Sequence, residues 1–171
     1  MTLQEASGAD FSADRVYRRL LWRRWDESLP WLCMIMLNPS KAGAVESDPT
    51  VTRQIERAKR LNCGGLLVTN AFDLVATDPR EMKRHPKPNT LENDEAIFEA
   101  VHRTVGSGGT VIAAWGKDGA HRGRDKFIGE MLCGVCQLHA LAVTKEGQPG
   151  HPLYIGYDVK PFPWPVIEGA K

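Results

Sequence analysis

Apolar residues fall into four short, nearly unbroken runs along the chain, and more polar segments separate these runs. A continuous apolar run of this length is typical of a strand that is covered on both faces, as in the parallel sheets of α/β proteins. The pattern therefore predicts four buried strands, within residues 31–37, 66–70, 110–115 and 137–144.

Helical patterns lie between these runs. The first is expected to begin near Pro49, because proline suits the first turn of a helix, and to run to about residue 61. The other two cover residues 93–105 and about 122–133. Because strands and helices alternate, we expect a single domain over residues 1–171 of the α/β class, with three α/β/α layers and a central, mostly parallel four-stranded sheet.

The N-terminal part is expected to add an edge to this sheet. Residues 16–25 mix β-favouring side chains with arginines, and a turn-rich stretch separates them from the strand that begins at residue 31. We expect a hairpin whose arginine strand lies at the sheet edge, where charge discourages aggregation. A helix over the same residues is the alternative. Residues 1–12 are small and polar, so they are expected to be frayed and disordered.

The composition limits the classes of function. The 171 residues carry a net charge of +1, so the whole molecule is not an electrostatic nucleic-acid binder. No apolar run reaches the roughly 20 residues that span a bilayer, and no secretory signal is visible, so we expect a cytoplasmic protein without a membrane partner. Basic residues gather in three groups that could contact phosphate or form solvated faces. These groups are Arg15, Arg18, Arg19, Arg23 and Arg24; Lys83, Arg84 and Lys87; and Lys117, Arg122, Arg124 and Lys126.

The sequence lacks the usual motifs for binding a metal or a cofactor. Cys133 and Cys136 form a CxxC, but a tetrahedral zinc site needs two further ligands at a suitable spacing. No P-loop, no GxGxxG after a strand and no GxSxG is present, which argues against phosphoryl transfer, dinucleotide binding and serine hydrolysis. We therefore expect no metal and no cofactor, and small buried cysteines.

Residues whose side chains could contact a ligand stand at the ends of the predicted strands. Asn38 and Asn70 end the first two, Trp115 ends the third, and His151 comes after the fourth. Because open α/β sheets bind ligands beyond the carboxyl ends of their strands, we expect Asn38, Asn70 and His151 to surround one cleft. The alternative is that the asparagines cap loop backbone and that His151 is an ordinary turn residue.

The motifs at these strand ends resemble those of the uracil-DNA glycosylase superfamily. They are NPS at residues 38–40, LLVTNAF at 66–72, VIAAWG at 111–116 and HPLY at 151–154. Their order and spacing agree over roughly residues 31–156, and the likeness is to a small, uncharacterised bacterial branch. The resemblance implies that Asn38 holds the attacking water, that Asn70 reads the edge of a flipped base, and that His151 faces the base carbonyl where negative charge gathers.

The chain departs from the superfamily pattern at three places. Met36 stands where glycine is usual, the last motif has leucine where serine is usual, and no aromatic residue lies between Pro39 and Asn70, where one usually stacks on the base. The expected replacements for that ring are Phe72, Trp115 and Tyr154. Without a ring at the usual position, one wall of the pocket is left open, so we expect a larger pocket than is usual in the superfamily. The long loop of residues 71–90 could line the extra space.

The remaining expected contacts follow from the same resemblance and from charge. Pro39 and Ser40 are assigned to the substrate. The residues assigned to DNA are Lys41, Arg122, Arg124 and Leu153, and either Leu153 or Tyr154 is expected to fill the gap in the duplex as an apolar wedge.

The sequence therefore predicts a monofunctional DNA glycosylase, acting as a monomer on duplex DNA with a flipped base or on single strands. No lysine matches a catalytic position, so hydrolysis without a Schiff base is expected. The expected substrate is a modified pyrimidine, such as a bulky base of phage DNA, and plain uracil is expected to be poor. The alternatives are a non-catalytic nucleic-acid-binding module of this fold, or a hydrolase or transferase that acts on free nucleosides or nucleotides.

Overall fold

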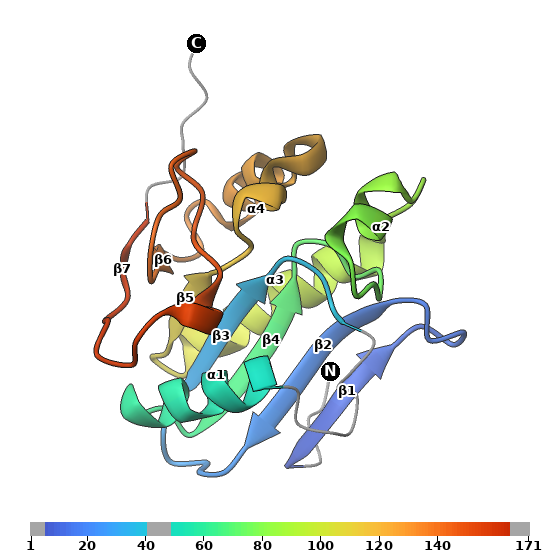
Figure 1. Cartoon of the computed structure of the whole chain (residues 1–171). Helices are drawn as coiled ribbons and strands as arrows, with labels where there is room; N and C mark the ends of the chain where they lie inside the picture. The colour runs from blue at the N-terminus through green and yellow to red at the C-terminus, as the bar shows by residue number, and fades with distance from the viewer. Residues whose placement is uncertain (1–5, 41–48, 165–171) are drawn as a thin grey trace.

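The computed structural model describes residues 6–40 and 49–164 (Figure 1). Its described strands form one seven-stranded sheet in the order β1-β2-β4-β3-β5-β6-β7. The bounds are β1 (Ser7–Phe11), β2 (Arg18–Arg24), β3 (Trp31–Met36), β4 (Gly65–Asn70), β5 (Thr110–Ala113), β6 (Leu138–Ala140) and β7 (Phe162–Pro163). Strands β4, β3, β5 and β6 are parallel to their neighbours in this block, whereas β1, β2 and β7 are joined to it by antiparallel pairing.

Helices cover both faces of the parallel block. Figure 1 shows α1 (Pro49–Arg60) in front of the sheet and α3 (Leu91–Gly106) behind it, on the same face as α4 (Arg124–Leu132). Alternate residues of β3 enter the two layers: Cys33 and Ile35 join the cluster under α3 and α4, while Leu32 and Met34 join the cluster under α1. The three-layer α/β/α arrangement predicted from the sequence is confirmed.

The helices begin where local chemistry favours it. The α1 helix starts at the predicted Pro49. Helix α3 starts two residues earlier than predicted because the Thr90 hydroxyl accepts a hydrogen bond from Asn93 N at 3.3 Å and caps it. The long loop contains a short helix that its proline-rich sequence did not indicate, α2 (Pro79–Arg84), capped by Asp78. Two short 3₁₀ segments complete the described elements, η1 (Lys117–Gly123) and η2 (Pro152–Tyr154).

The N-terminal expectations were wrong in two respects. Residues Ser7–Phe11 are not frayed: they form the edge strand β1, which pairs with β2. The arginine strand β2 is not at the edge and forms no hairpin with β3, since it lies between β1 and β4. Because β2 is buried at Leu20 and Leu21, its backbone N–H and C=O groups need hydrogen-bond partners along both edges of the strand. Strand β4 supplies the partners along one edge, and β1 supplies them along the other.

The last parallel strand is shorter than predicted. Only Leu138–Ala140 pair with neighbours in the sheet, and Val143 instead forms an isolated bridge with Pro149. The chain then returns across the face that carries α1, where Ile155 and Val159 pack against the core. None of the described helices is both long and apolar enough to cross a membrane.

A buried carboxyl group anchors the start of the long loop. Asp73 is 0% exposed, its two oxygens accept hydrogen bonds from Thr90 N at 3.0 Å and Thr90 Oγ1 at 2.5 Å, and burial raises its pKa above the usual 3.8. The unfolded chain therefore ionises Asp73 more readily, so this residue's contribution to stability falls as pH rises from the usual value through the raised one.

We expect Asp73→Asn to remove this pH dependence, because the amide keeps the packing and cannot ionise. Urea unfolding at a series of pH values should show the variant gaining stability relative to the wild type as pH rises through that range. A difference that stays constant with pH would contradict the raised pKa.

Candidate functional site

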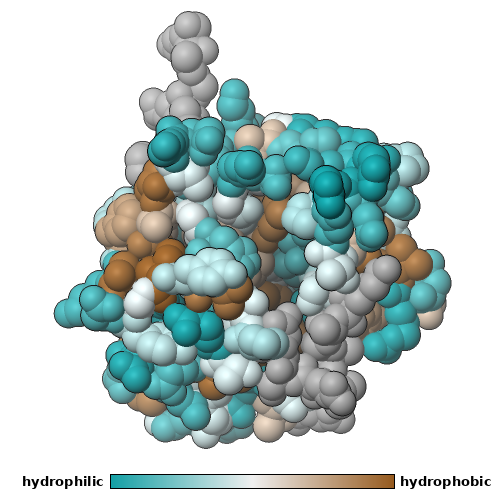
Figure 2. Space-filling view, in the orientation of Figure 1, coloured by the Kyte–Doolittle hydropathy of each residue, from teal (hydrophilic) through white to brown (hydrophobic). Residues whose placement is uncertain are grey.

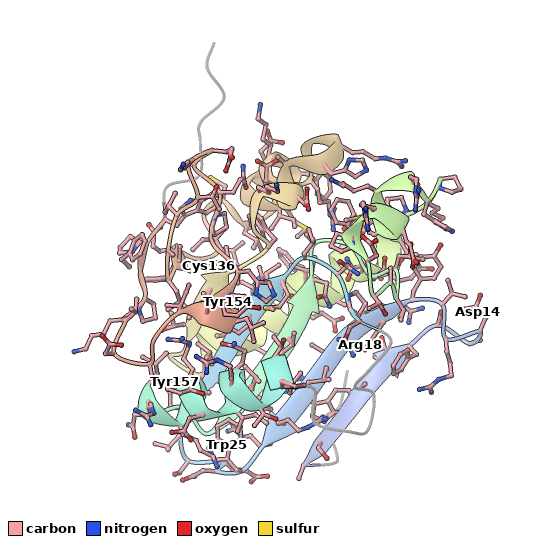
Figure 3. All side chains as sticks on the ribbon, in the orientation of Figure 1. Asp14, Arg18, Trp25, Cys136, Tyr154 and Tyr157 are labelled. Carbon is pink, nitrogen blue, oxygen red and sulfur yellow. The ribbon has the colours of Figure 1, made fainter. Side chains whose placement is uncertain are left out.

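A pocket of about 220 Å³ lies at the carboxyl ends of β3 and β4. The described residues that line it are Arg18, Met36, Leu37, Asn38, Ser40, Thr50, Val51, Val68, Asn70, Ala76, Thr77, Pro79 and His151. In Figure 3, Arg18 and Tyr154, a near neighbour of His151 in sequence, lie on opposite sides of these two strands. Asn38, Asn70 and His151, which the sequence predicted to surround one cleft, thus line the same pocket.

The amide of Asn38 is held in a fixed orientation. Its Nδ2 donates to the carbonyl oxygen of Ala76 at 2.7 Å and to that of Pro39 at 3.2 Å. Because an amide nitrogen has two protons and both are used, the group that remains for a ligand is the acceptor Oδ1. An acceptor held in this way suits the binding and orientation of a water molecule.

Asn70 brings an unused donor to the pocket. It is the last residue of β4 and pairs with Met36 of β3, and its side chain is 2% exposed. Its backbone oxygen accepts a hydrogen bond from Asn93 Nδ2 at 3.0 Å, but its own Nδ2 has no partner among the described residues. A buried donor without a partner costs about 1–3 kcal/mol, so the site favours a ligand that offers an acceptor here.

His151 presents its other ring nitrogen as a donor. It caps η2, and its Nδ1 accepts a hydrogen bond from Leu153 N at 3.3 Å. Because Nδ1 is an acceptor, the proton of the neutral imidazole is on Nε2. The pocket therefore has a histidine whose tautomer is set for donation from Nε2.

Arg18 is a pocket residue that the sequence interpretation missed. It is 5% exposed and is the first residue of β2. Because β2 runs antiparallel to β4, its start lies at the same edge of the sheet as the end of β4. The sequence placed Arg18 only among basic surface residues, although the rule that an antiparallel neighbour begins at this edge could have identified it. A guanidinium remains charged at any ordinary pH, so it adds a permanent cation to the pocket wall.

The long loop also contributes to the wall, as the sequence predicted. Ala76 and Thr77 line the pocket, and so does Pro79, the first residue of α2. Backbone pairing fixes this wall to the first motif, because Ala76 N donates to Pro39 O at 2.9 Å. Thr50 and Val51, from the first turn of α1, line the pocket as well.

One family profile matches the chain over residues 18–153, and its description reads protein of unknown function (DUF1643). The chain belongs to the DUF1643 family. The matched region begins at Arg18 and extends beyond His151, so it contains all of the described residues that line the pocket. No curated protein and no solved structure matches this DUF1643 chain.

The aromatic rings expected to stack on a base do not lie in the DUF1643 pocket. Phe72 and Trp115 are each 1% exposed and belong to the core under α3 and α4. Trp115 Nε1 donates to Gln148 Oε1 at 2.9 Å, and the ring of Phe72 lies 5.8 Å from that of His121. The stacking role assigned to both residues was wrong, because their side chains turn into the packed layer. Tyr154 is 92% exposed and lies on the surface.

Arg124 was wrongly assigned to DNA. It is 7% exposed, its Nε donates to Ala71 O at 2.5 Å, and its Nη2 contacts the carboxylate of Asp94 and, at 3.3 Å, Asn89 Oδ1. A buried guanidinium that is paired in this way is unavailable to phosphate. Its role is to hold the start of the long loop against α3.

The other assigned contacts differ in accessibility. Arg122 is exposed, while Leu153 is half-buried beside His151. Ser40 lines the pocket, whereas Pro39 is buried and is not among the lining residues. Lys41 lies outside the described residues.

The cysteines of this DUF1643 chain differ in their surroundings. Cys33 is fully buried, and burial raises the pKa of its thiol to about 12. Cys133 is exposed and Cys136 is half-buried (Figure 3 labels the second), so the expectation of buried cysteines was wrong for this pair. Over residues 6–40 and 49–164, no three His, Cys, Asp or Glu side chains are grouped so that they could hold a metal ion.

Proposed function

We propose that this DUF1643 protein is a monofunctional DNA glycosylase that takes a modified pyrimidine into the pocket and hydrolyses its N-glycosidic bond. The observation that carries the proposal is the convergence of Asn38, Asn70 and His151, from three distant parts of the sequence, on one pocket. Asn38 and His151 also contact nearby backbone groups, as loop capping would require, but capping does not account for the unpartnered Nδ2 of Asn70 in the same pocket. The resemblance of their motifs to the uracil-DNA glycosylase superfamily adds to this argument.

Asn38 is proposed to hold the attacking water. As the bond between C1′ and the base nitrogen breaks, its electron pair leaves with the base and the sugar gains oxocarbenium character. Water then needs orientation more than deprotonation, and the fixed Oδ1 of Asn38 can supply that orientation. The oxygen of the water bonds to C1′, one of its protons is lost to solvent, and the departing base takes up a proton.

His151 and Arg18 are proposed to stabilise the departing base. Negative charge gathers on the carbonyl oxygens of the base, and preorganised donors that face this charge lower the barrier. The Nε2 proton of His151 and the cation of Arg18 meet this need, while the unpartnered Nδ2 of Asn70 suits a base carbonyl.

The pocket volume supports entry of a pyrimidine ring rather than of a whole nucleotide, so a bulky substituent on the base would extend beyond the described lining residues. Sites for drug-sized ligands span about 300–1,000 Å³, and this pocket holds about 220 Å³. The sugar and phosphates would then stay outside it, as they do when a nucleotide is flipped from a strand.

A second candidate is a module that binds a base without cleaving the bond. None of the described lining residues is an Asp or a Glu, and none is a Phe, Tyr or Trp. A pocket without a carboxylate base or a stacking ring can still recognise a base by hydrogen bonds. The two candidates differ in whether an abasic product forms.

The test is incubation with duplex and single-stranded DNA that carry uracil, mismatched thymine, hypoxanthine, or glucosylated and other hypermodified pyrimidines, followed by alkali cleavage. We expect alkali-labile sites from a modified pyrimidine and little from uracil, because no aromatic wall confines the base among the described lining residues. Borohydride should trap no covalent adduct. Efficient release of uracil alone would overturn the substrate proposal, and retention of modified DNA without cleavage would favour the binding module.

A further inference from the structure

Two basic groups that are separate in the sequence meet in the structure. Arg122 of η1 donates from Nη1 to Pro86 O at 3.0 Å and from Nη2 to His85 O at 3.1 Å. Lys83 of α2 forms an ion pair with Asp118 of η1 at 2.9 Å. These contacts join the two elements into one basic surface, here called the α2–η1 surface. Its cationic residues are Arg80, Lys83, Arg84, Lys87 and Arg122.

The positive charge of this surface is only partly compensated. Asp78 pairs with Arg80 at 2.8 Å and Asp118 pairs with Lys83, and Glu81 is the remaining acidic residue of α2. Arg84 and Lys87 are exposed. The contacts of Arg122 that hold the loop are to neutral carbonyl groups, so they leave its charge in place.

The lowered pKa of His121 reflects the same excess of positive charge. Burial lowers the pKa of its imidazole, and the nearby cations Arg122 and Lys83 lower it further, whereas the nearby carboxylate of Asp118 acts in the opposite direction. Figure 2 shows hydrophilic residues gathered over α2 on the face that it presents. The surface is therefore a local cationic region on a chain whose net charge is +1.

The surface adjoins the pocket and is firmly held. Helix α2 begins at Pro79, which lines the pocket together with Thr77. At the other end of the loop, the Tyr17 hydroxyl donates to Lys87 O at 3.0 Å. Cations on a rigid support beside a base-sized pocket suit a ligand whose anionic groups are attached to the base that enters the pocket.

We propose that the α2–η1 surface binds the phosphate backbone of the nucleic-acid strand whose base enters the pocket; this inference rests on the proposed function. Lysine and arginine contacts to phosphate fix the register of a strand without reading its sequence. Each such contact releases counterions, so binding through this surface falls with rising salt. An acidic protein or a lipid headgroup would satisfy the charges but not the neighbouring pocket.

The test compares two charge-reversal variants of equal net charge. Arg84→Glu with Lys87→Glu alters the α2–η1 surface. Arg103→Glu with Lys160→Glu alters exposed residues at the end of α3 and near the C-terminal strand. Binding of each protein to a fluorescein-labelled DNA duplex is measured by anisotropy over about 50–200 mM salt. Thermal melting checks that both variants fold.

The surface variant is expected to bind the duplex about tenfold more weakly or worse. The slope of the logarithm of the binding constant against the logarithm of salt concentration should fall in magnitude by about 2, one for each phosphate contact removed. The control variant should bind as the wild type does. Equal binding by both variants would overturn the proposal, and so would wild-type protein that binds vesicles of anionic lipid but not DNA.

The outcome separates this proposal from the proposed function. Loss of duplex binding in the surface variant, with no abasic product from any wild-type reaction, supports the surface and counts against the glycosylase. Abasic product from both variants at equal rates and equal affinities supports the glycosylase and overturns the surface.

Discussion

Replacing His151 with alanine is expected to slow base release about 100- to 1000-fold, the usual loss when one preorganised donor at a developing negative charge is removed. The imidazole lines the pocket with its Nδ1 engaged by Leu153 N, so the Nε2 proton is the group that alanine deletes. Asn38→Ala should cause a similar loss, because its fixed amide oxygen no longer orients water. Single-turnover rates on the best substrate of the base panel measure both effects.

Duplex binding should stay close to the wild-type value in both variants, since neither side chain belongs to the α2–η1 surface. His102→Gln is a matched control, because His102 is exposed on α3 and contacts the ring of Phe98. Unchanged turnover in both His151→Ala and Asn38→Ala would end the glycosylase assignment.

Arg124→Met is expected to cost roughly 3 kcal/mol of unfolding free energy, at the lower end of the loss when one partner of a buried ion pair is removed, because Asp94 is partly exposed. The substitution leaves the Asp94 carboxylate without its cation and Ala71 O without its donor. Urea denaturation at neutral pH measures the loss.

Arg122→Met provides the comparison for this variant. Arg122 is exposed and contacts only backbone carbonyls in the described hydrogen bonds, so we expect a loss of about 1 kcal/mol or less. A small loss in Arg124→Met, accompanied by weaker DNA binding, would restore the phosphate role first assigned to Arg124.

The parallel block was predictable because its strands are covered on both faces. The six residues of β3 are all buried, and so are the six of β4, which is why their sequences contain so few polar positions. The edge strand β1 was not predictable, since the same small polar residues would suit a frayed terminus. The pairing of β2 with β4 joins segments far apart in the sequence, and no local pattern encodes that choice.

The site was predictable to the extent that strand ends determine it. Asn38 comes shortly after β3 and Asn70 ends the adjacent parallel strand β4, so both lie at one edge of the sheet. The stacking rings were not predictable from position alone. Phe72 is only two residues beyond Asn70, yet the turn after β4 directs its side chain into the core rather than into the pocket.

The segment of residues 71–90, which supplies part of the pocket wall, is tied at both ends and in the middle to three separate parts of the fold. Asn38 holds Ala76, Tyr17 holds Lys87, and the junction of η1 and α4 holds Ala71 through Arg124 and Pro86 through Arg122. Ordering a free segment costs roughly 1–2 kcal/mol for each residue, and here that cost falls within folding rather than within association. Under the proposed function, binding would therefore need little rearrangement of this segment, and the deformation that accompanies base flipping would fall on the nucleic acid.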